Sequence, residues 1–194
     1  LIGKIQVKNL IMAMLACNES NLAINKIIKV IEKIKPVQGR LEKIGNLFDK
    51  SIVILDFAHT PEALKSCLLS VREHFKFSKI SIVFGCGGER DKPKRKIMGK
   101  IANDYCDKIY LTDDNPRKEN PKKIRSQIKV KIKRSKFIEI PSREKAIFQA
   151  INDLIPGEIL LIAGKGHESY QEYINKKFFS DKKCILQNIK LKNK

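Results

Sequence analysis

The chain has 194 residues, an apolar content of 42% and a formal net charge of +19. Its length suits one domain of ordinary size plus part of a neighbour, and no apolar run reaches the roughly 18 residues of a membrane span, so we expect no membrane partner. Of the basic residues 32 are Lys and only eight are Arg, and they are neither clustered nor interleaved with aromatic side chains, which argues against nucleic acid as a partner.

The five cysteines are scattered along the chain without CxxC spacing. An odd, dispersed set argues against a disulfide framework and against a zinc site, so we expect no bound metal and a reducing, cytoplasmic location. The first residues, Leu1 to Lys4, show neither an initiator Met nor a signal-peptide pattern. They are typical of a segment from within a longer chain.

The N-terminal part of the chain predicts two helices, residues 6–17 and 22–34, each with apolar side chains at helical spacing. Ser20 or Asn21 can cap the second helix. Two helices with this much apolar surface should pack against another part of the protein.

A domain boundary is predicted at Lys35–Pro36, because proline disfavours helix in the residue before it. The boundary separates a fragment, residues 1–35, from a domain formed by residues 36–194.

Strands and helices alternate from residue 37 onward. The strands are apolar throughout, which is typical of strands covered on both faces. Such alternation predicts a three-layer α/β fold with a doubly wound, mostly parallel sheet, in which ligands bind beyond the carboxyl ends of the strands. The predicted strands are 51–55, 80–84, 108–111, 137–140 and 158–163, and the helices are 61–75, 93–106, 121–133 and 143–154.

The first strand is followed by a turn with Asp56 and His59, close to the positive end of the next helix. The alternative interpretation is purely structural: Thr60 caps the helix and Asp56 binds the turn.

The second strand is followed by a glycine-rich loop, residues 85–95. Glycines let a backbone turn sharply or approach a ligand, but the loop matches neither GxGxxG nor the end of a P-loop. It carries Arg90, Lys92 and Arg95, and the planar fork of Arg suits a carboxylate. A solvated turn with salt bridges is the alternative.

The loop after the third strand, residues 112–117, contains two acids, an amide and Arg117. This mixture of donors and acceptors suits a zwitterion, and a simple Asx-type turn is the alternative. In the loop after the last strand, Lys165 could neutralise a phosphate and Glu168 could accept from an ammonium. Because these loops meet at one edge of the sheet, together they predict a single ligand site.

Five segments resemble the Mur ligases, and among them the members that add meso-diaminopimelate to UDP-N-acetylmuramoyl-L-alanyl-D-glutamate. They occur in the family's order, and residues 1–35, with Asn9, resemble the last helices of its central ATP-binding domain. The resemblance implies a Rossmann-like C-terminal domain that brings the incoming amino acid to the site. The segments are PVQGRLE (36–42), DFAHTP (56–61), GCGGERDKPKR (85–95), DDNPR (113–117) and AGKGHE (163–168).

The resemblance also implies two sets of binding residues. Arg117 would read the carboxylate that meso-diaminopimelate has and lysine lacks, since lysine-adding relatives have a small residue there. The residues implied for meso-diaminopimelate are Arg90, Asp114, Asn115, Arg117, Gly164 and Glu168, and those implied for the nucleotide are Asn9, Arg40, Asp56 and His59.

The implied reaction uses ATP and Mg²⁺ to phosphorylate a carboxylate of the UDP-MurNAc-dipeptide. The amine of the incoming amino acid then attacks the acyl phosphate, and phosphate departs through a tetrahedral intermediate to leave an amide. The family's GTNGKT phosphate loop, its modified lysine and its UDP-sugar domain do not occur in this sequence. We therefore assign no catalytic residue and expect this chain alone not to ligate. As a separate expectation, the protein is a monomer.

Two other functions fit the same sequence less well. One is a sister ligase that adds lysine, against which Arg117 argues, or that recycles murein tripeptide, which should differ around the glycine-rich loop. The other is a noncatalytic module that binds nucleotides or anions. A nonspecific polyanion binder would lose affinity steeply with salt, whereas a ligase domain would discriminate between amino acids.

Overall fold

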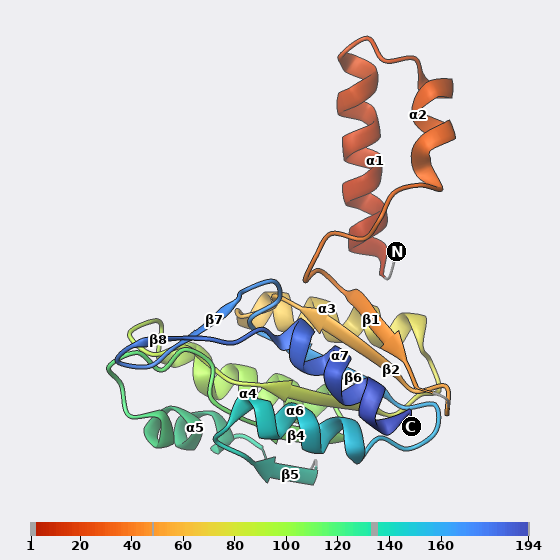
Figure 1. Ribbon diagram of the computed structural model, residues 1–194. Helices are drawn as coiled ribbons and strands as arrows, with labels where there is room; N and C mark the ends of the chain where they lie inside the picture. The colour runs from red at the N-terminus through yellow and green to blue at the C-terminus, as the bar shows by residue number, and fades with distance from the viewer. Residues whose placement is uncertain (1–2, 48, 133–135, 194) are drawn as a thin grey trace.

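A six-stranded sheet with the order β1-β2-β6-β3-β4-β5 forms the centre of the molecule (Figure 1). This computed structural model describes residues 3–47, 49–132 and 136–193. All neighbouring strands are parallel except β1, which is antiparallel to β2. The strands are β1 (Glu42–Asn46), β2 (Ile52–Asp56), β3 (Ile80–Phe84), β4 (Lys108–Leu111), β5 (Lys136–Glu139) and β6 (Ile159–Ala163).

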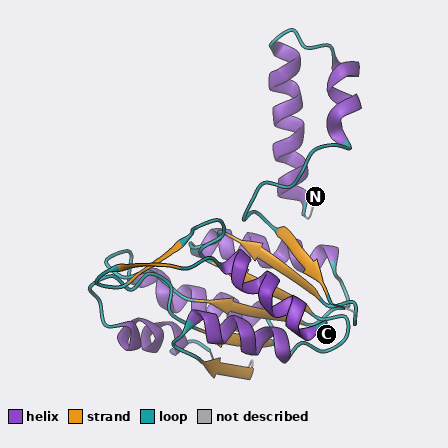
Figure 2. Cartoon of the chain, in the orientation of Figure 1, coloured by secondary structure: helices purple, strands orange, loops and turns teal. Residues whose placement is uncertain are grey.

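Helices cover both faces of the sheet and complete the three predicted layers (Figure 2). Side chains of the central strands alternate between two cores, so that Ile54 packs with one set of helices while Val53 packs with the other. The predicted doubly wound α/β fold is therefore confirmed. One face carries α3 (Pro61–His74), α4 (Pro93–Tyr105) and α5 (Pro121–Lys129), and the other carries α6 (Arg143–Asn152) and α7 (Asp181–Lys192).

Two helices, α1 (Lys4–Glu19) and α2 (Ile24–Ile31), project from the sheet domain (Figure 1). They contact each other, yet α1 buries no residue and α2 buries only Ile27. Within the described residues, the expected packing partner for their apolar surface is not found. The predicted boundary at Lys35–Pro36 stays a prediction.

The predicted cap of the second helix is wrong. Ser20 instead donates its hydroxyl to the carbonyl O of Ala16 in the preceding helix, at 2.9 Å. Asn21 has a left-handed backbone with φ of 65°, and Ala23 precedes α2 without a side-chain cap. The first helix therefore ends with a side-chain hydrogen bond to its own backbone, and the second helix begins two residues later than the sequence suggests.

Several elements of the fold were not predicted from the sequence pattern. The edge strand β1 and the hairpin of β7 (Tyr170–Glu172) and β8 (Lys176–Phe178) are short and polar, and α7 follows them. The helix predicted over 121–133 ends at Lys129, and residue 133 lies outside the described residues. None of the helices in the described ranges is long and apolar enough to cross a membrane.

Candidate functional site

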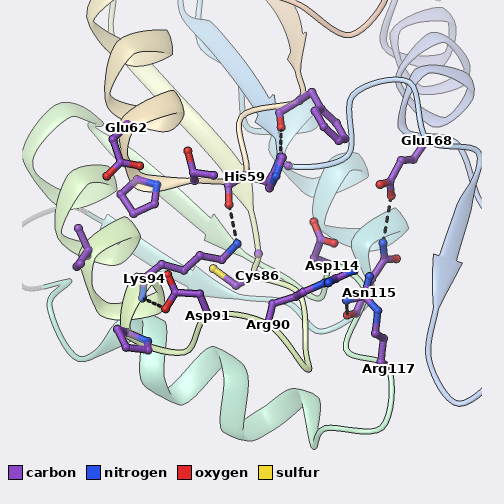
Figure 3. Close-up of a pocket in the computed structure, with 18 residues that line it drawn as sticks. His59, Glu62, Cys86, Arg90, Asp91, Lys94, Asp114, Asn115, Arg117 and Glu168 are labelled. Atoms are coloured by element: carbon purple, nitrogen blue, oxygen red, sulfur yellow. Dashed lines mark hydrogen bonds between the residues drawn. The ribbon is translucent and has the colours of Figure 1, made fainter.

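Four loops at the carboxyl ends of β2, β3, β4 and β6 surround a hollow of about 580 Å³ (Figure 3). The lining includes every residue implied for the amino acid, although these residues come from three separate segments of the sequence. They are Arg90, Asp114, Asn115, Arg117, Gly164 and Glu168.

Two glycines allow the glycine-rich loop to pack directly on the loop after β4. A methyl group added at Gly88 would overlap the carbonyl O of Pro116, and one at Gly85 would overlap that of Thr112. The N–H of Gly88 donates to the carbonyl O of Asn115 at 2.9 Å. The glycines thus bring two loops together at the edge of the hollow.

Lys165 is fully buried beneath the hollow and links two of its walls. Its Nζ donates to Oδ1 of Asn115 at 2.9 Å and to Oε2 of Glu168 at 2.8 Å. Nδ2 of Asn115 also donates to Oε2 of Glu168, at 3.1 Å (Figure 3). Lys165 thus bridges Asn115 and Glu168, and the phosphate contact that the sequence suggested stays a prediction.

Arg117 reaches the hollow from an unusual backbone conformation. Its φ is 52°, in the left-handed region that non-glycine residues seldom adopt. Its Nη1 donates to the carbonyl O of Gly88 at 2.8 Å, and its Nε lies 3.2 Å from Oε2 of Glu172. The guanidinium is thus restrained at the mouth of the site before any ligand arrives.

The lining of the hollow carries charges of both signs. The carboxylate of Asp114 is largely buried, and Gly164, with φ of 111°, brings its backbone against it, because a Cβ there would lie 2.8 Å from Oδ2. The exposed side chain of Arg90 extends toward Asp114 and Asn115 (Figure 3). Cations beside carboxylates suit a ligand that carries both kinds of charge.

Arg95 does not line the hollow; its guanidinium fork instead binds a carboxylate of the protein itself. It is fully buried, and its Nη1 and Nη2 donate to the two carboxylate oxygens of Glu119 at 2.9 and 3.0 Å. These hydrogen bonds lower the pKa of Glu119 to about 2. Nη2 also donates to the carbonyl O of Gly87 at 3.1 Å, so Arg95 anchors the glycine-rich loop.

Asp56 fulfils the structural interpretation of its turn. Its carboxylate accepts from the N–H groups of Leu41 and Ala58, each at 2.7 Å, and burial raises its pKa. The N–H of Ala63 donates to Oγ1 of Thr60 at 3.3 Å, which confirms the predicted cap.

The residues implied for the nucleotide fall into two places. A second hollow of about 380 Å³ lies between α1 and the sheet domain, and Asn9, Arg40 and Asp56 line it. His59 lines the first hollow instead, where its backbone carbonyl accepts from Nζ of Lys94 at 2.8 Å (Figure 3). The nucleotide roles stay predictions.

The sequence did not single out Lys94 or the hairpin as parts of the site. Lys94 lines the hollow and stands on the first turn of α4, which the quoted motif covers, so its position could have been found. Gln171 donates its Nε2 to the carbonyl O of Asp114 at 2.8 Å, from a hairpin that carries no motif. No motif in the sequence indicated that contact.

The described residues do not form a site for Mg²⁺. No group of three or more His, Cys, Asp or Glu side chains gathers into a metal site in the part of the chain that the structure describes. The glycine-rich loop packs on a neighbouring loop, as shown above. No step that involves the metal is therefore assigned to this chain.

Comparisons with known proteins agree on one family. Residues 39–166 match the family described as Mur ligase, glutamate ligase domain. A protein from Rickettsia felis named UDP-N-acetylmuramoyl-L-alanyl-D-glutamate–2,6-diaminopimelate ligase is 43% identical over 196 residues, which cover 100% of this chain and 36% of that protein. A protein of the same name from Buchnera aphidicola is 43% identical over 195 residues, covering 100% of this chain and 38% of its own length.

Solved structures agree in the fold. A structure of UDP-N-acetylmuramoyl-L-alanyl-D-glutamate–2,6-diaminopimelate ligase superposes on 100% of this chain and 40% of its own, with a TM-score of 0.78 and 34% identity. UDP-N-acetylmuramate-alanine ligase from Thermotoga maritima covers 99% of this chain and 37% of its own with a TM-score of 0.65, but at 17% identity it shows the fold alone. The chain spans well under half the length of these relatives.

Proposed function

This chain belongs to the Mur ligase family, and we propose that the full-length protein that contains it adds meso-diaminopimelate to UDP-N-acetylmuramoyl-L-alanyl-D-glutamate in peptidoglycan synthesis. One observation carries the proposal: the residues implied for meso-diaminopimelate, from three distant segments, line one hollow. Relatives bearing this name are similar over the whole of this chain, which supports the choice within the family.

The charges of the hollow suit the proposed amino acid. Arg90 and Arg117 offer guanidinium groups to its carboxylates, while Asp114 and Glu168 offer carboxylates to its ammonium groups. Meso-diaminopimelate carries one carboxylate more than lysine, and Arg117 would bind it. Removing one partner of such a charge-assisted pair costs about 2 to 5 kcal/mol of binding free energy, which is enough to discriminate between the two amino acids.

The site's part in the reaction is to hold and orient the nucleophile. Fixing the amino acid against the acyl phosphate makes the attack of its amine effectively unimolecular. ATP supplies the phosphoryl group, and the remainder of the full-length protein would bind its phosphates and Mg²⁺. Asn9, Arg40 and Asp56, around the second hollow, would contact the nucleotide from this side. We place the reaction in the cytoplasm, where the soluble substrates of the proposed reaction would be available.

The test is a ligation assay on the full-length protein with meso-diaminopimelate and with lysine, repeated with Arg117→Ala. We expect the unmutated protein to prefer meso-diaminopimelate and Arg117→Ala to lose that preference. Lys118→Ala, which removes an exposed neighbouring charge, should retain it. A preference of the unmutated protein for lysine would show that the substrate assignment is wrong.

A further inference from the structure

Glu172, the last residue of β7, makes three contacts with the loop after β4. Its N–H donates to Oδ1 of Asn115 at 2.9 Å, and its carbonyl O accepts from the N–H of Arg117 at 3.0 Å. Its Oε2 lies 3.2 Å from Nε of Arg117. One residue outside every quoted motif thus contacts two of the residues that line the hollow.

The contacts of Arg117 leave one part of its guanidinium available. Nη1 donates to the carbonyl O atoms of Gly88 at 2.8 Å and Asn115 at 3.3 Å, and Nε faces Glu172. Within the described ranges, Nη2 is the guanidinium nitrogen for which no hydrogen bond is found. Nη2 is therefore the group best placed to bind a ligand carboxylate.

Restraint matters at this position because nothing intrinsic to Arg117 fixes its direction. A left-handed backbone is unfavourable for a residue with a Cβ, and a long Arg side chain has many rotamers. Glu172 contacts both the backbone and the side chain of Arg117: its carbonyl O accepts from the backbone N–H, and its carboxylate lies against Nε. Both side chains are about three-quarters buried, with 20% and 26% of their surfaces exposed, so solvent only partly screens the pair.

We propose that Glu172 is a positioning residue for amino-acid selection. Its carboxylate fixes the Arg117 guanidinium beside the hollow, so that the free Nη2 meets the second carboxylate of a diamino diacid without first being ordered. The inference rests on the proposed function, since it takes Arg117 as the residue that reads that carboxylate.

The test measures KM and kcat of the full-length protein for meso-diaminopimelate and for lysine in Glu172 variants. In Glu172→Ala we expect KM for meso-diaminopimelate to rise about two- to fivefold, the range of one partly exposed ion pair. Neither kcat nor the weak reaction with lysine should change, because lysine lacks the carboxylate concerned. Glu144→Ala removes an exposed carboxylate away from the hollow and should behave like the unmutated protein.

Two further variants separate positioning from charge. Glu172→Gln keeps the length of the side chain and an oxygen that can accept from Nε. Its KM for meso-diaminopimelate should therefore stay close to that of the unmutated protein. Glu172→Asp keeps the charge but is too short to reach Nε, so it should resemble Glu172→Ala. The reverse order, or an equal loss with both amino acids, would overturn the positioning role, and thermal unfolding of each variant reports on the fold.

The outcomes also distinguish this inference from the proposed function. If Arg117→Ala loses the preference for meso-diaminopimelate while Glu172→Ala keeps an unchanged KM, the role of Glu172 alone is wrong. If the unmutated protein prefers lysine, the proposed function is wrong whatever the Glu172 variants do.

Discussion

The ammonium of Lys165 lies 2.9 Å from Oδ1 of Asn115, and this buried contact joins the loop after β6 to the loop after β4. Since Lys165 also bonds Glu168, we expect Lys165→Met to misplace both side chains. The free energy of unfolding should fall by about 2 to 3 kcal/mol, the value of a hydrogen bond to a charged group, and KM for meso-diaminopimelate should rise. Chemical unfolding and the ligation assay on the full-length protein measure the two effects.

The matched control is Lys176→Met. Nζ of Lys176 lies 4.9 Å from the centre of the Tyr170 ring, much as that of Lys165 lies 5.3 Å from it, but Lys176 is exposed. Its loss should change stability by less than about 0.5 kcal/mol. Equal effects of the two substitutions would contradict the role assigned to the buried lysine.

Gly88→Ala tests the packing of the glycine-rich loop. The new methyl group would overlap the carbonyl O of Pro116, so the loop must shift away from Asn115 and Arg117. A displacement of this kind should lower kcat/KM for meso-diaminopimelate by more than about tenfold. Gly157→Ala is the control: it has φ of 76° and no atom within 4 Å of a new Cβ, so it should cost about 1 to 2 kcal/mol of stability and leave KM unchanged.

The Arg95–Glu119 pair predicts a defined pH dependence. Hydrogen bonds from Arg95 lower the pKa of Glu119 from 4.5 to about 2, so the pair stabilises the fold fully above pH 4.5. That stabilisation is lost as the pH falls toward 2, because the folded state must then accept a proton that it binds weakly. At pH 7, Glu119→Gln leaves the buried Arg95 without a counter-charge and should cost about 3 kcal/mol.

Unfolding of the unmutated protein and of Glu119→Gln between pH 7 and pH 2 checks this prediction. The difference in unfolding free energy should be constant above about pH 5 and shrink below it, as linkage requires. Glu73→Gln, at an exposed pair with Lys4, should differ from the unmutated protein by less than about 0.5 kcal/mol throughout. A difference that does not change with pH would contradict the assigned pKa.

The sequence predicted the parts of the fold that depend on local patterns. Apolar runs such as Ile80–Phe84 specified the parallel strands, and the loops that follow them were correctly expected to meet at one edge. The hairpin of β7 and β8 was missed because its strands are three residues long and carry mostly polar side chains, without an apolar run. Nothing local distinguishes such a segment from a loop.

The segments singled out in the sequence line one hollow, but which of their charged side chains face it could not be predicted. Arg90 and Arg95 look equivalent in the sequence, yet one is exposed beside the hollow and the other is fully buried against Glu119. Lys165, which the sequence suggested for a phosphate contact, is likewise buried and donates to Asn115. Whether a charge meets solvent or another chain segment depends on long-range packing, which spacing in the sequence does not encode.

The segment between α2 and β1 is anchored to the sheet domain close to β1. Gly39 packs its backbone, with φ of 66°, against that of Gly166 and His167, and Leu41 is bonded to Asp56. Gln6 of α1 donates its Nε2 to the carbonyl O of Arg40 at 3.3 Å, so the helix pair contacts the same stretch that Gly39 and Leu41 fix to the sheet domain. Arg40, between the two anchors, therefore keeps a fixed place beside the second hollow, and its carbonyl O gives α1 a point of contact there.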